Sequence, residues 1–235
     1  MARSEVTAMK SMPPHQSIVR LLAVACTPTG LCLSLELLPE GDLLSHILDF
    51  DTGLPEANAL HIFRQLAEGL AHMHSHGLVH RDLKPENVGL IKAADGSMSA
   101  KWIDLGTAYA CFPGERNLVG YCGTPVYMPP EIAVWLNEPH DSRVPKYGLP
   151  ADCWSLGVLL YVMLTGEAPW DQDLELSSMM NTIRTTDVPF PVDAWAGVAS
   201  NASRLVRQLL VRMPEARLSA PQILAHPWLA DGREK

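Results

Sequence analysis

The stretch Val79–Leu90, "VHRDLKPENVGL", decides how this chain is interpreted. An apolar approach leads into a run that contains His, Arg, Asp, Lys, Glu and Asn, and the sequence becomes apolar again at Val88. The chain as a whole is 47% hydrophobic and only 19% charged. So dense a group of polar side chains therefore points to a chemical purpose.

Three residues of this stretch have the chemistry that phosphoryl transfer requires. That reaction uses a carboxylate to accept the proton of the attacking hydroxyl, a cation near the transferred group, and oxygen ligands for Mg²⁺. Asp82, Lys84 and Asn87 supply one of each. A second metal ligand has to come from elsewhere, and "IDLGTA" provides Asp104. Residues 88–91 and 101–103 flank "KAADGSMSA", so we predict a hairpin that returns Asp104 to the side of Asn87.

Composition limits the class of protein. The 235 residues suffice for one large or two small domains. The net charge of −8 argues against nucleic acid as a partner and is compatible with basic peptides. Five cysteines without a CxxC pair and without a signal peptide indicate a reducing compartment, cytoplasmic or nuclear. The longest apolar run, Leu156–Leu164, is shorter than the roughly 20 residues that span a membrane, so we expect a buried core helix and no membrane association.

Hydrophobic periodicity predicts a small β-bearing part followed by a larger helical part. Residues 18–24 and 31–38 are expected to form a strand pair, and Pro39–Asp42 is the candidate boundary. Asp42 can cap a helix over 43–50. A longer helix should begin at Pro55, place Leu60, Phe63, Leu66, Leu70 and Met73 on one face, and end at Gly77. Further helices are predicted over 152–165, 174–184, 201–211 and 219–225.

Five motifs in register resemble the eukaryotic-type protein kinase family. "HRDLKPEN" resembles its catalytic loop, and "DLG" its metal-binding DFG. "GTPVYMPPE" resembles the end of its activation segment, "ADCWSLGVLLYVMLTGEAPW" its central helix, and "RLSAPQILAHPWL" its closing helix. The resemblance is to the serine/threonine branch and, in "HPWL", to the calcium/calmodulin-dependent group. It implies an α+β, two-lobed fold with a truncated small β lobe (1–40), a large helical lobe (41–230) and a tail (231–235).

The resemblance also implies roles for single residues, with ATP and Mg²⁺ as cofactors. Asp82 would be the catalytic base, Lys84 would neutralise the γ-phosphate, and Asn87 and Asp104 would bind Mg²⁺. Asp152 would anchor the backbone of the catalytic loop, although an ordinary helix cap is the alternative. His80 and Leu105 would stack in an internal apolar column. Glu131 and Arg217 would form an ion pair.

The segment "LELLPEGDL" resembles the hinge that holds the nucleotide base. Leu35 would be the gatekeeper, backbone groups near Glu36 and Leu38 would meet adenine, and Asp42 could reach the ribose. For Glu40 and Asp42, solvated surface and ligand contact are equally good interpretations. Gly89 stands where the family usually places an aliphatic residue beneath the adenine.

One departure divides the functional hypotheses. No two glycines are closer than three residues, so the 235 residues contain no GxGxxG loop over the phosphates. Glu5 matches the helix glutamate of the family, but no lysine precedes it. The first hypothesis is an ATP-dependent serine/threonine kinase, because Asp82, Lys84, Asn87 and Asp104 are all present. The alternative is a catalytically weak pseudokinase or docking module, and in either case we expect weak activity from these residues alone.

Further expectations concern substrate and regulation. Glu86, with Glu40 and Asp42 nearby, favours protein substrates with Arg or Lys upstream of the target Ser or Thr. The usual phosphate acceptor position that pairs with Arg81 is Gly120, so activity should not depend on phosphorylation there; Glu115 could offer a weaker anionic partner.

The sequence also predicts which residues are buried and which lie on the surface. Trp154, Trp170 and Trp228 are expected in the core, and the cysteines are expected to be buried and inert. The histidines of "HMHSHGLVH" are interpreted as a helix end, with a metal site as the less favoured alternative. The segment 133–150 is expected to form a surface insertion.

Overall fold

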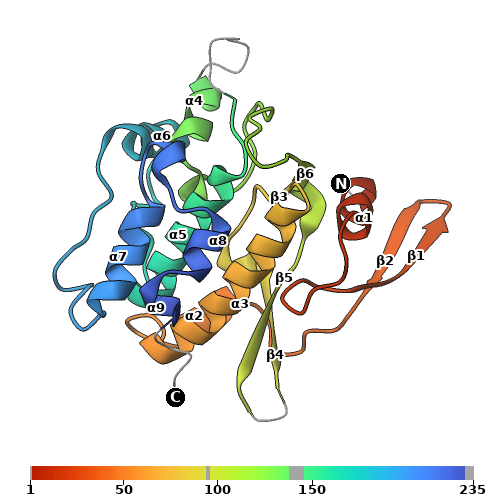
Figure 1. Ribbon diagram of the computed structural model, residues 1–235, viewed down its shortest axis with the longest axis horizontal. Helices are drawn as coiled ribbons and strands as arrows, with labels where there is room; N and C mark the ends of the chain where they lie inside the picture. The colour runs from red at the N-terminus through yellow and green to blue at the C-terminus, as the bar shows by residue number, and fades with distance from the viewer. Residues whose placement is uncertain (1, 94–95, 138–145, 231–235) are drawn as a thin grey trace.

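A computed structural model describes residues 2–93, 96–137 and 146–230 (Figure 1). The helices are α1 (Ala2–Lys10), α2 (Leu43–Leu48), α3 (Glu56–Ser75), α4 (Pro130–Asn137), α5 (Pro150–Thr165), α6 (Leu176–Thr185), α7 (Ser200–Leu209), α8 (Ala220–Leu224) and α9 (Pro227–Ala230). The strands are β1 (Leu21–Thr27), β2 (Gly30–Leu35), β3 (Leu78–Val79), β4 (Val88–Lys92), β5 (Met98–Trp102) and β6 (Tyr109–Ala110). The architecture combines a small sheet-bearing part with a larger helical part.

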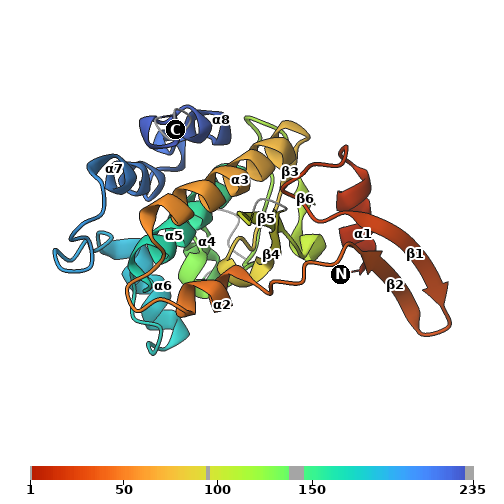
Figure 2. The ribbon, with the colours of Figure 1, turned by 90° about the horizontal axis from the view of Figure 1, so that it is seen from below.

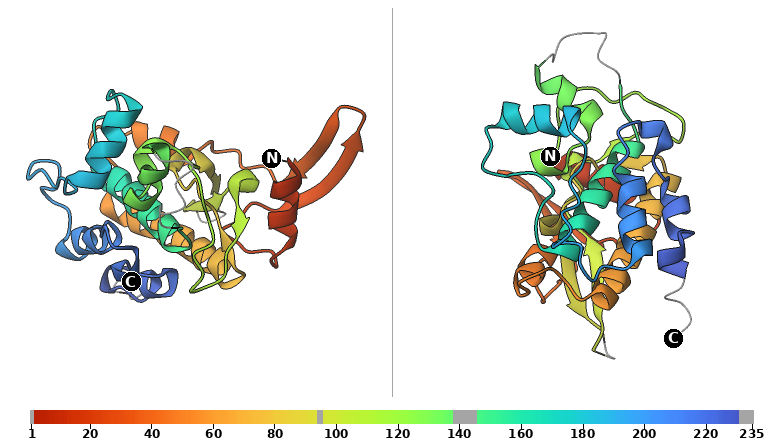
Figure 3. Two further views of the ribbon diagram at one scale, coloured as in Figure 1. Left: turned by 90° about the horizontal axis from the view of Figure 1, so that it is seen from above. Right: turned by 90° about the vertical axis from the view of Figure 1, so that its left-hand side faces the viewer.

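The predicted strand pair is confirmed as the antiparallel hairpin β1–β2, which begins three residues later than expected in its first strand. Figures 1 and 3 show this hairpin projecting away from the helical body, with α1 beside it. Every β1 side chain after Leu21 is exposed. The expectation that the cysteines are buried is therefore wrong for Cys26 and Cys32, which both lie exposed on this hairpin because no further strand of the described chain covers it.

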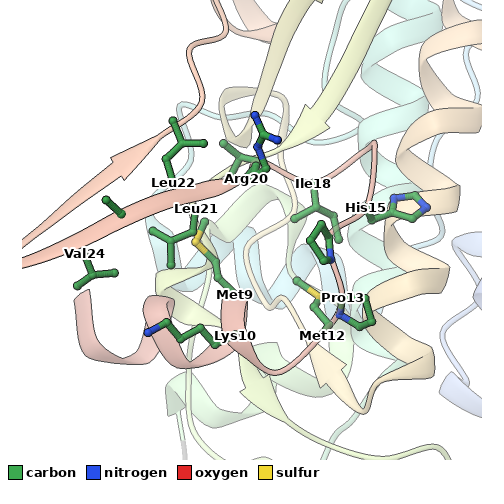
Figure 4. A pocket seen from close by; sticks show the side chains of 13 residues that line it. Met9, Lys10, Met12, Pro13, His15, Ile18, Arg20, Leu21, Leu22 and Val24 are labelled. Carbon is green, nitrogen blue, oxygen red and sulfur yellow. The ribbon is translucent and has the colours of Figure 1, made fainter.

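The segment before β1 fastens the small part to the helical body. Ile18 and Trp102 form a parallel bridge, in which the Val19 N–H donates to the Trp102 carbonyl at 2.9 Å and the Trp102 N–H to the Ser17 carbonyl at 2.9 Å. The indole of Trp102 is buried and donates to the Leu66 carbonyl inside α3. A cavity of about 360 Å³ lies between α1 and β1, where Met9 lies beside Leu21 (Figure 4).

Helices α3 and α5 form the centre of the helical body (Figure 2). Four of the five residues on the predicted face of α3, Phe63, Leu66, Leu70 and Met73, are fully buried, and the fifth, Leu60, is partly buried. Gly77 ends that helix in a left-handed conformation, as expected from a glycine stop. All residues of α5 from Ala151 to Thr165 are buried, which confirms the predicted core helix.

The three tryptophans expected in the core, at positions 154, 170 and 228, are all buried. In the part of the chain with described coordinates, no helix is long and apolar enough to cross a membrane.

Two short pairings position the catalytic loop. The hairpin β4–β5 is confirmed, with Val88 opposite Trp102, although β5 begins earlier than predicted. Strands β3 and β6 were not anticipated; they pair Leu78 with Ala110 and Val79 with Tyr109. Helix α4 was also not anticipated. Residues 138–145 of the proposed insertion lie outside the described residues.

Candidate active site

The catalytic loop Val79–Leu90 is held from below by Asp152, at the start of α5. Its buried carboxylate accepts hydrogen bonds from the backbone N–H groups of His80 at 2.8 Å and Arg81 at 2.9 Å. The Nε2 atom of His74 lies 2.9 Å from the same carboxylate. Burial alone would raise the pKa of Asp152, but the bond and charge of His74, with the charge of His80, outweigh it and lower the pKa. The anchoring interpretation of Asp152 agrees with these contacts.

Asp82 and Lys84 meet through a third residue, Thr124. The Thr124 hydroxyl donates to Asp82 Oδ1 at 2.8 Å and accepts from Lys84 Nζ at 2.8 Å. Lys84 Nζ also lies 3.6 Å from Asp82 Oδ2. A carboxylate and an ammonium group are thus held side by side with both still partly open to solvent, as a proton acceptor and a phosphate-neutralising cation need to be.

Asn87 and Asp104 lie together, as the predicted hairpin required. The amide nitrogen of Asn87 donates to the Asp82 carbonyl at 2.8 Å and to Asp82 Oδ2 at 3.1 Å, which leaves its amide oxygen available as a ligand. The Ile103 N–H donates to the Asn87 carbonyl at 2.9 Å, so the next residue, Asp104, stands beside Asn87. Asp104 Oδ1 accepts from the Gly106 N–H at 3.1 Å, and its second oxygen accepts no hydrogen bond from the residues that the structure describes. An amide oxygen and a carboxylate oxygen are the donors that Mg²⁺ prefers.

Backbone strain is concentrated at this site. Arg81 (φ +72°) and Asp104 (φ +55°) are the two residues other than glycine with positive φ in the described ranges. Each such conformation costs on the order of 1 kcal/mol or more and persists only where surrounding contacts enforce it. The Arg81 N–H is bonded to Asp152, and Ile103, the neighbour of Asp104, is bonded to the Asn87 carbonyl, so contacts hold both positions.

Glu5 lies near Asp104, because α1 packs against Leu105–Thr107. Partial burial raises the pKa of the Glu5 carboxyl, and the negative charge of Asp104 raises it further. No salt bridge formed within the described residues includes Glu5. The site thus carries an excess of negative charge, which a bound cation would relieve.

The proposed hinge follows β2. The Glu36 N–H donates to the Arg20 carbonyl at 3.0 Å, and its carboxylate bonds Lys101 Nζ at 2.8 and 2.9 Å. Burial alone would raise the pKa of Glu36, but hydrogen bonds from Lys101 and the Arg20 N–H lower it. Asp42 caps α2, accepting from the Ser45 N–H at 2.7 Å, so its predicted capping role is confirmed.

Leu35, at the end of β2, and Leu38 complete the hinge residues that the sequence pointed to, and both are partly buried. Glu40 is exposed. The hinge is joined to strands β4 and β5 by the bridge between Asp42 and Gly89 and by the Glu36–Lys101 ion pair. The same two strands follow Asn87 and precede Asp104 in the chain.

Comparison with known proteins decides the family. Residues 1–229 match the protein kinase domain. This chain belongs to the protein kinase family. It is 34% identical over 225 residues to the probable serine/threonine-protein kinase fhkE of Dictyostelium discoideum, 35% over 230 residues to serine/threonine-protein kinase DCLK3 of Homo sapiens, and 34% over 227 residues to a probable myosin light chain kinase of Dictyostelium discoideum. These alignments cover 95–97% of this chain but 30%, 33% and 55% of those relatives, respectively.

In this kinase domain, the activation segment is fixed to the helical lobe by the Glu131–Arg217 pair. The predicted ion pair is confirmed, with both Arg217 amino groups bonded to the Glu131 carboxylate at 2.6 and 2.7 Å. The guanidinium also donates to three carbonyls, those of Val211, Pro150 and Arg212.

Arg81 turns toward the start of the activation segment. Its Nε donates to the Thr107 carbonyl at 2.6 Å, and its guanidinium lies 5.3 Å from the Tyr109 ring centre. Glu115, considered as an anionic partner for Arg81, instead accepts from the Phe112 N–H and from Asn117. Arg81 therefore contacts a carbonyl and an aromatic face.

Two threonines of the kinase site were missed as functional residues. Thr124 had served only as a marker of the serine/threonine branch, yet its hydroxyl joins Asp82 and Lys84. Thr107 donates to the His80 carbonyl at 2.8 Å and so ties the "DLGT" turn to the catalytic loop. The one available sequence signal was that each threonine follows a glycine inside a recognised motif, in "DLGT" and "CGTP".

The residues present fit Mg²⁺ better than they fit a triphosphate. The free oxygens of Asn87 and Asp104 and the negative charge near Glu5 suit a divalent cation. For the phosphates, Lys84 is the cation that this site offers, and the sequence holds no glycine-rich loop.

Proposed function

We propose that this chain carries the catalytic lobe of an ATP-dependent serine/threonine protein kinase. The observation that carries the proposal is the hydrogen-bonded set Asp82–Thr124–Lys84, with Asn87 and Asp104 at its side. The relatives named serine/threonine-protein kinases support the same reaction class. The five free cysteines support a reducing compartment such as the cytoplasm.

In this proposal, the residues of the loop have separate tasks. Asp82 orients the substrate hydroxyl and accepts its proton, while Thr124 holds the Asp82 carboxylate in place. Lys84 places a positive charge beside Asp82, where charge develops during transfer. Asn87 and Asp104 would hold Mg²⁺, which would supply positive charge to neutralise the phosphates.

Glu86 supports a preference for basic substrates. Its Oε2 atom is buried and, among the described residues, has no hydrogen-bond partner. An unpaired buried carboxylate oxygen is unfavourable, so an incoming Arg or Lys would gain a charge-assisted bond there. Such bonds are worth about 1.5–3 kcal/mol, roughly tenfold to a hundredfold in discrimination. Exposed Glu40 adds negative charge nearby, whereas the Asp42 carboxylate is already used as a cap.

A second candidate is a docking module without useful catalysis. Taken by themselves, these 235 residues contain neither a GxGxxG loop nor a lysine before Glu5, the groups that would hold the phosphates. Without these groups, the triphosphate would meet one protein cation, Lys84, in a site open to water, where electrostatic contacts are weaker. We therefore expect the 235 residues alone to bind ATP poorly and to transfer phosphate slowly. We also propose that the boundary between the small and the large lobe lies at Pro39–Asp42.

The test compares phosphotransfer from Mg·ATP to two Ser peptides that differ in having Arg or Ala upstream. It uses the 235-residue chain and a longer form that adds a glycine-rich loop and a strand lysine. Asp82→Asn should lower the rate of the longer form about 10²–10⁴-fold. Asp193→Asn, at an exposed position, is the matched control. If the longer form transfers nothing, the docking alternative stands. If Asp82→Asn keeps the wild-type rate, the assignment of Asp82 as the proton acceptor is wrong. Equal rates for the two peptides would reject the Glu86 assignment only.

A further inference from the structure

Gly89 and Leu38 meet where β4 passes beneath the hinge. A Cβ atom built on Gly89 would lie 2.3 Å from Cδ1 of Leu38 and 3.3 Å from its Cβ. Since real Cβ atoms essentially never come within 3.0 Å of another heavy atom, the space that a side chain at position 89 would fill is already taken by Leu38. The next neighbour of that space is Ile103 Cγ2 at 3.4 Å. Gly89 and Leu38 are thus complementary in size.

The hinge is held over β4 by backbone contacts. The Glu40 N–H donates to the Leu90 carbonyl at 3.2 Å, and the Leu90 N–H donates to the Gly41 carbonyl at 2.9 Å. These bonds flank Leu38 and Gly89 on the C-terminal side of both residues. The main chain therefore holds Leu38 over Gly89 from the C-terminal side of the contact.

An ion pair holds the other end of the hinge. Lys101 stands directly opposite Gly89 in the β4–β5 register, so both point to the same face of the hairpin. Its ammonium group bonds the Glu36 carboxylate, two residues before Leu38. Both side chains of this pair are mostly buried, which limits screening by solvent.

We propose that the side chain of Leu38, in place of a β4 side chain, forms the apolar floor of the base-binding site. This rests on the proposed function, because it assumes that a purine ring lies above Gly89. A glycine offers a flat base almost no dispersion contact, whereas a leucine at the same spot restores it. Leu38 thereby becomes the residue that determines how well this chain holds the base.

The test uses adenosine, which carries the base without the phosphates and so does not depend on the missing phosphate contacts. Binding is followed by NMR titration of the 235-residue chain, its Leu38→Ala and Gly89→Leu variants, and the double variant. Leu38→Ala should weaken binding about tenfold. Gly89→Leu alone should also weaken it, because two side chains then compete for one space. The double variant should recover most of the affinity, since the floor is again a single leucine.

Leu48→Ala, an exposed leucine at the end of α2, is the matched control and should bind as wild type does. Melting curves without ligand check that each variant is folded. If Leu38→Ala does not fold, Leu38→Val takes its place. If adenosine binds wild type but Leu38→Ala binds equally or more tightly, the floor assignment falls and the kinase proposal is untouched. If neither adenosine nor ATP binds the wild-type chain or its longer form, both proposals fall.

Discussion

Asp152 is a single carboxylate that serves two backbone N–H groups and His74 from a fully buried position. Asp152→Asn would keep the shape but present an NH₂ group to one of those donors. We expect the free energy of unfolding to fall by about 2–4 kcal/mol, because a buried network is broken. Urea denaturation measures this change, with Asp193→Asn as the control. A loss below about 0.5 kcal/mol, the range of ordinary surface substitutions, would contradict the anchoring role.

His80 makes stability depend on pH. Burial lowers its pKa, and the charges of Asp152 and Asp82 only partly oppose this. Because the unfolded state then binds a proton more readily, the His80 contribution is fully present above about pH 6.5 and is lost as the pH falls below that value. His80→Gln should reduce this slope by up to about 1.4 kcal/mol per pH unit.

The measurement is urea unfolding between pH 7.5 and 5.5, with the same substitution at exposed His61 as the control. Burial also lowers the pKa of His15 and His226, so the comparison is made by difference. An unchanged slope in His80→Gln would show that His80 gains its proton equally in both states.

Among the elements, α4, α5 and the turn before α8 are joined by Arg217. Its side chain is fully buried and donates to Glu131 and to three carbonyls. Arg217→Lys keeps the charge but loses the planar fork, leaving several buried acceptors unpaired. We expect a loss of about 3 kcal/mol or more in unfolding free energy. Arg184→Lys, on the exposed face of α6, should change stability little; equal effects of the two substitutions would reject this role for the guanidinium.

The activation segment gives a regulatory prediction. Gly120 cannot accept a phosphate, Tyr121 is the one hydroxyl between residues 112 and 123, and Arg81 already contacts Thr107 and Tyr109. Phosphatase treatment of the active longer form should therefore leave its rate unchanged, as should Tyr121→Phe. Loss of activity on phosphatase treatment, traced by mass spectrometry to a phosphate on Tyr121, would overturn the prediction.

The elements differ in how far the sequence predicts them. Long periodic helices such as α3 and α5 and the β4–β5 hairpin were predictable, because many side chains repeat one preference. Strands β3 and β6 have two residues each, too few for any periodicity. The link through Thr124 joins residues about 40 positions apart and depends on tertiary folding alone. The exposure of Cys26 was missed because it depends on which strands cover β1.

At the scale of the whole molecule, the projecting hairpin β1–β2 is the part that favours association with other chains. Its two strands contain no charged residue, and Leu22 is 53% exposed. An isolated hairpin with an unprotected apolar edge favours pairing with other chains. We expect the 235-residue chain to associate as concentration rises, and Leu22→Lys with Val24→Lys to reduce this. Light scattering measures it, with Leu48→Lys as the control; equal association of both variants would place the contact elsewhere.

The Asp152 anchor also fixes an order of events during folding. The β4–β5 hairpin is local, whereas the bonds from Asp152 to the catalytic loop span 71 and 72 residues. Closing a long loop is slower than forming a hairpin. Helix α3 and the hairpin can therefore form while the chain is still being synthesised, but the backbone of the loop between them is anchored only after α5 has emerged and docked. A nascent chain that ends before α5 carries every residue of the HRDLKPEN motif without the carboxylate that holds the His80 and Arg81 N–H groups.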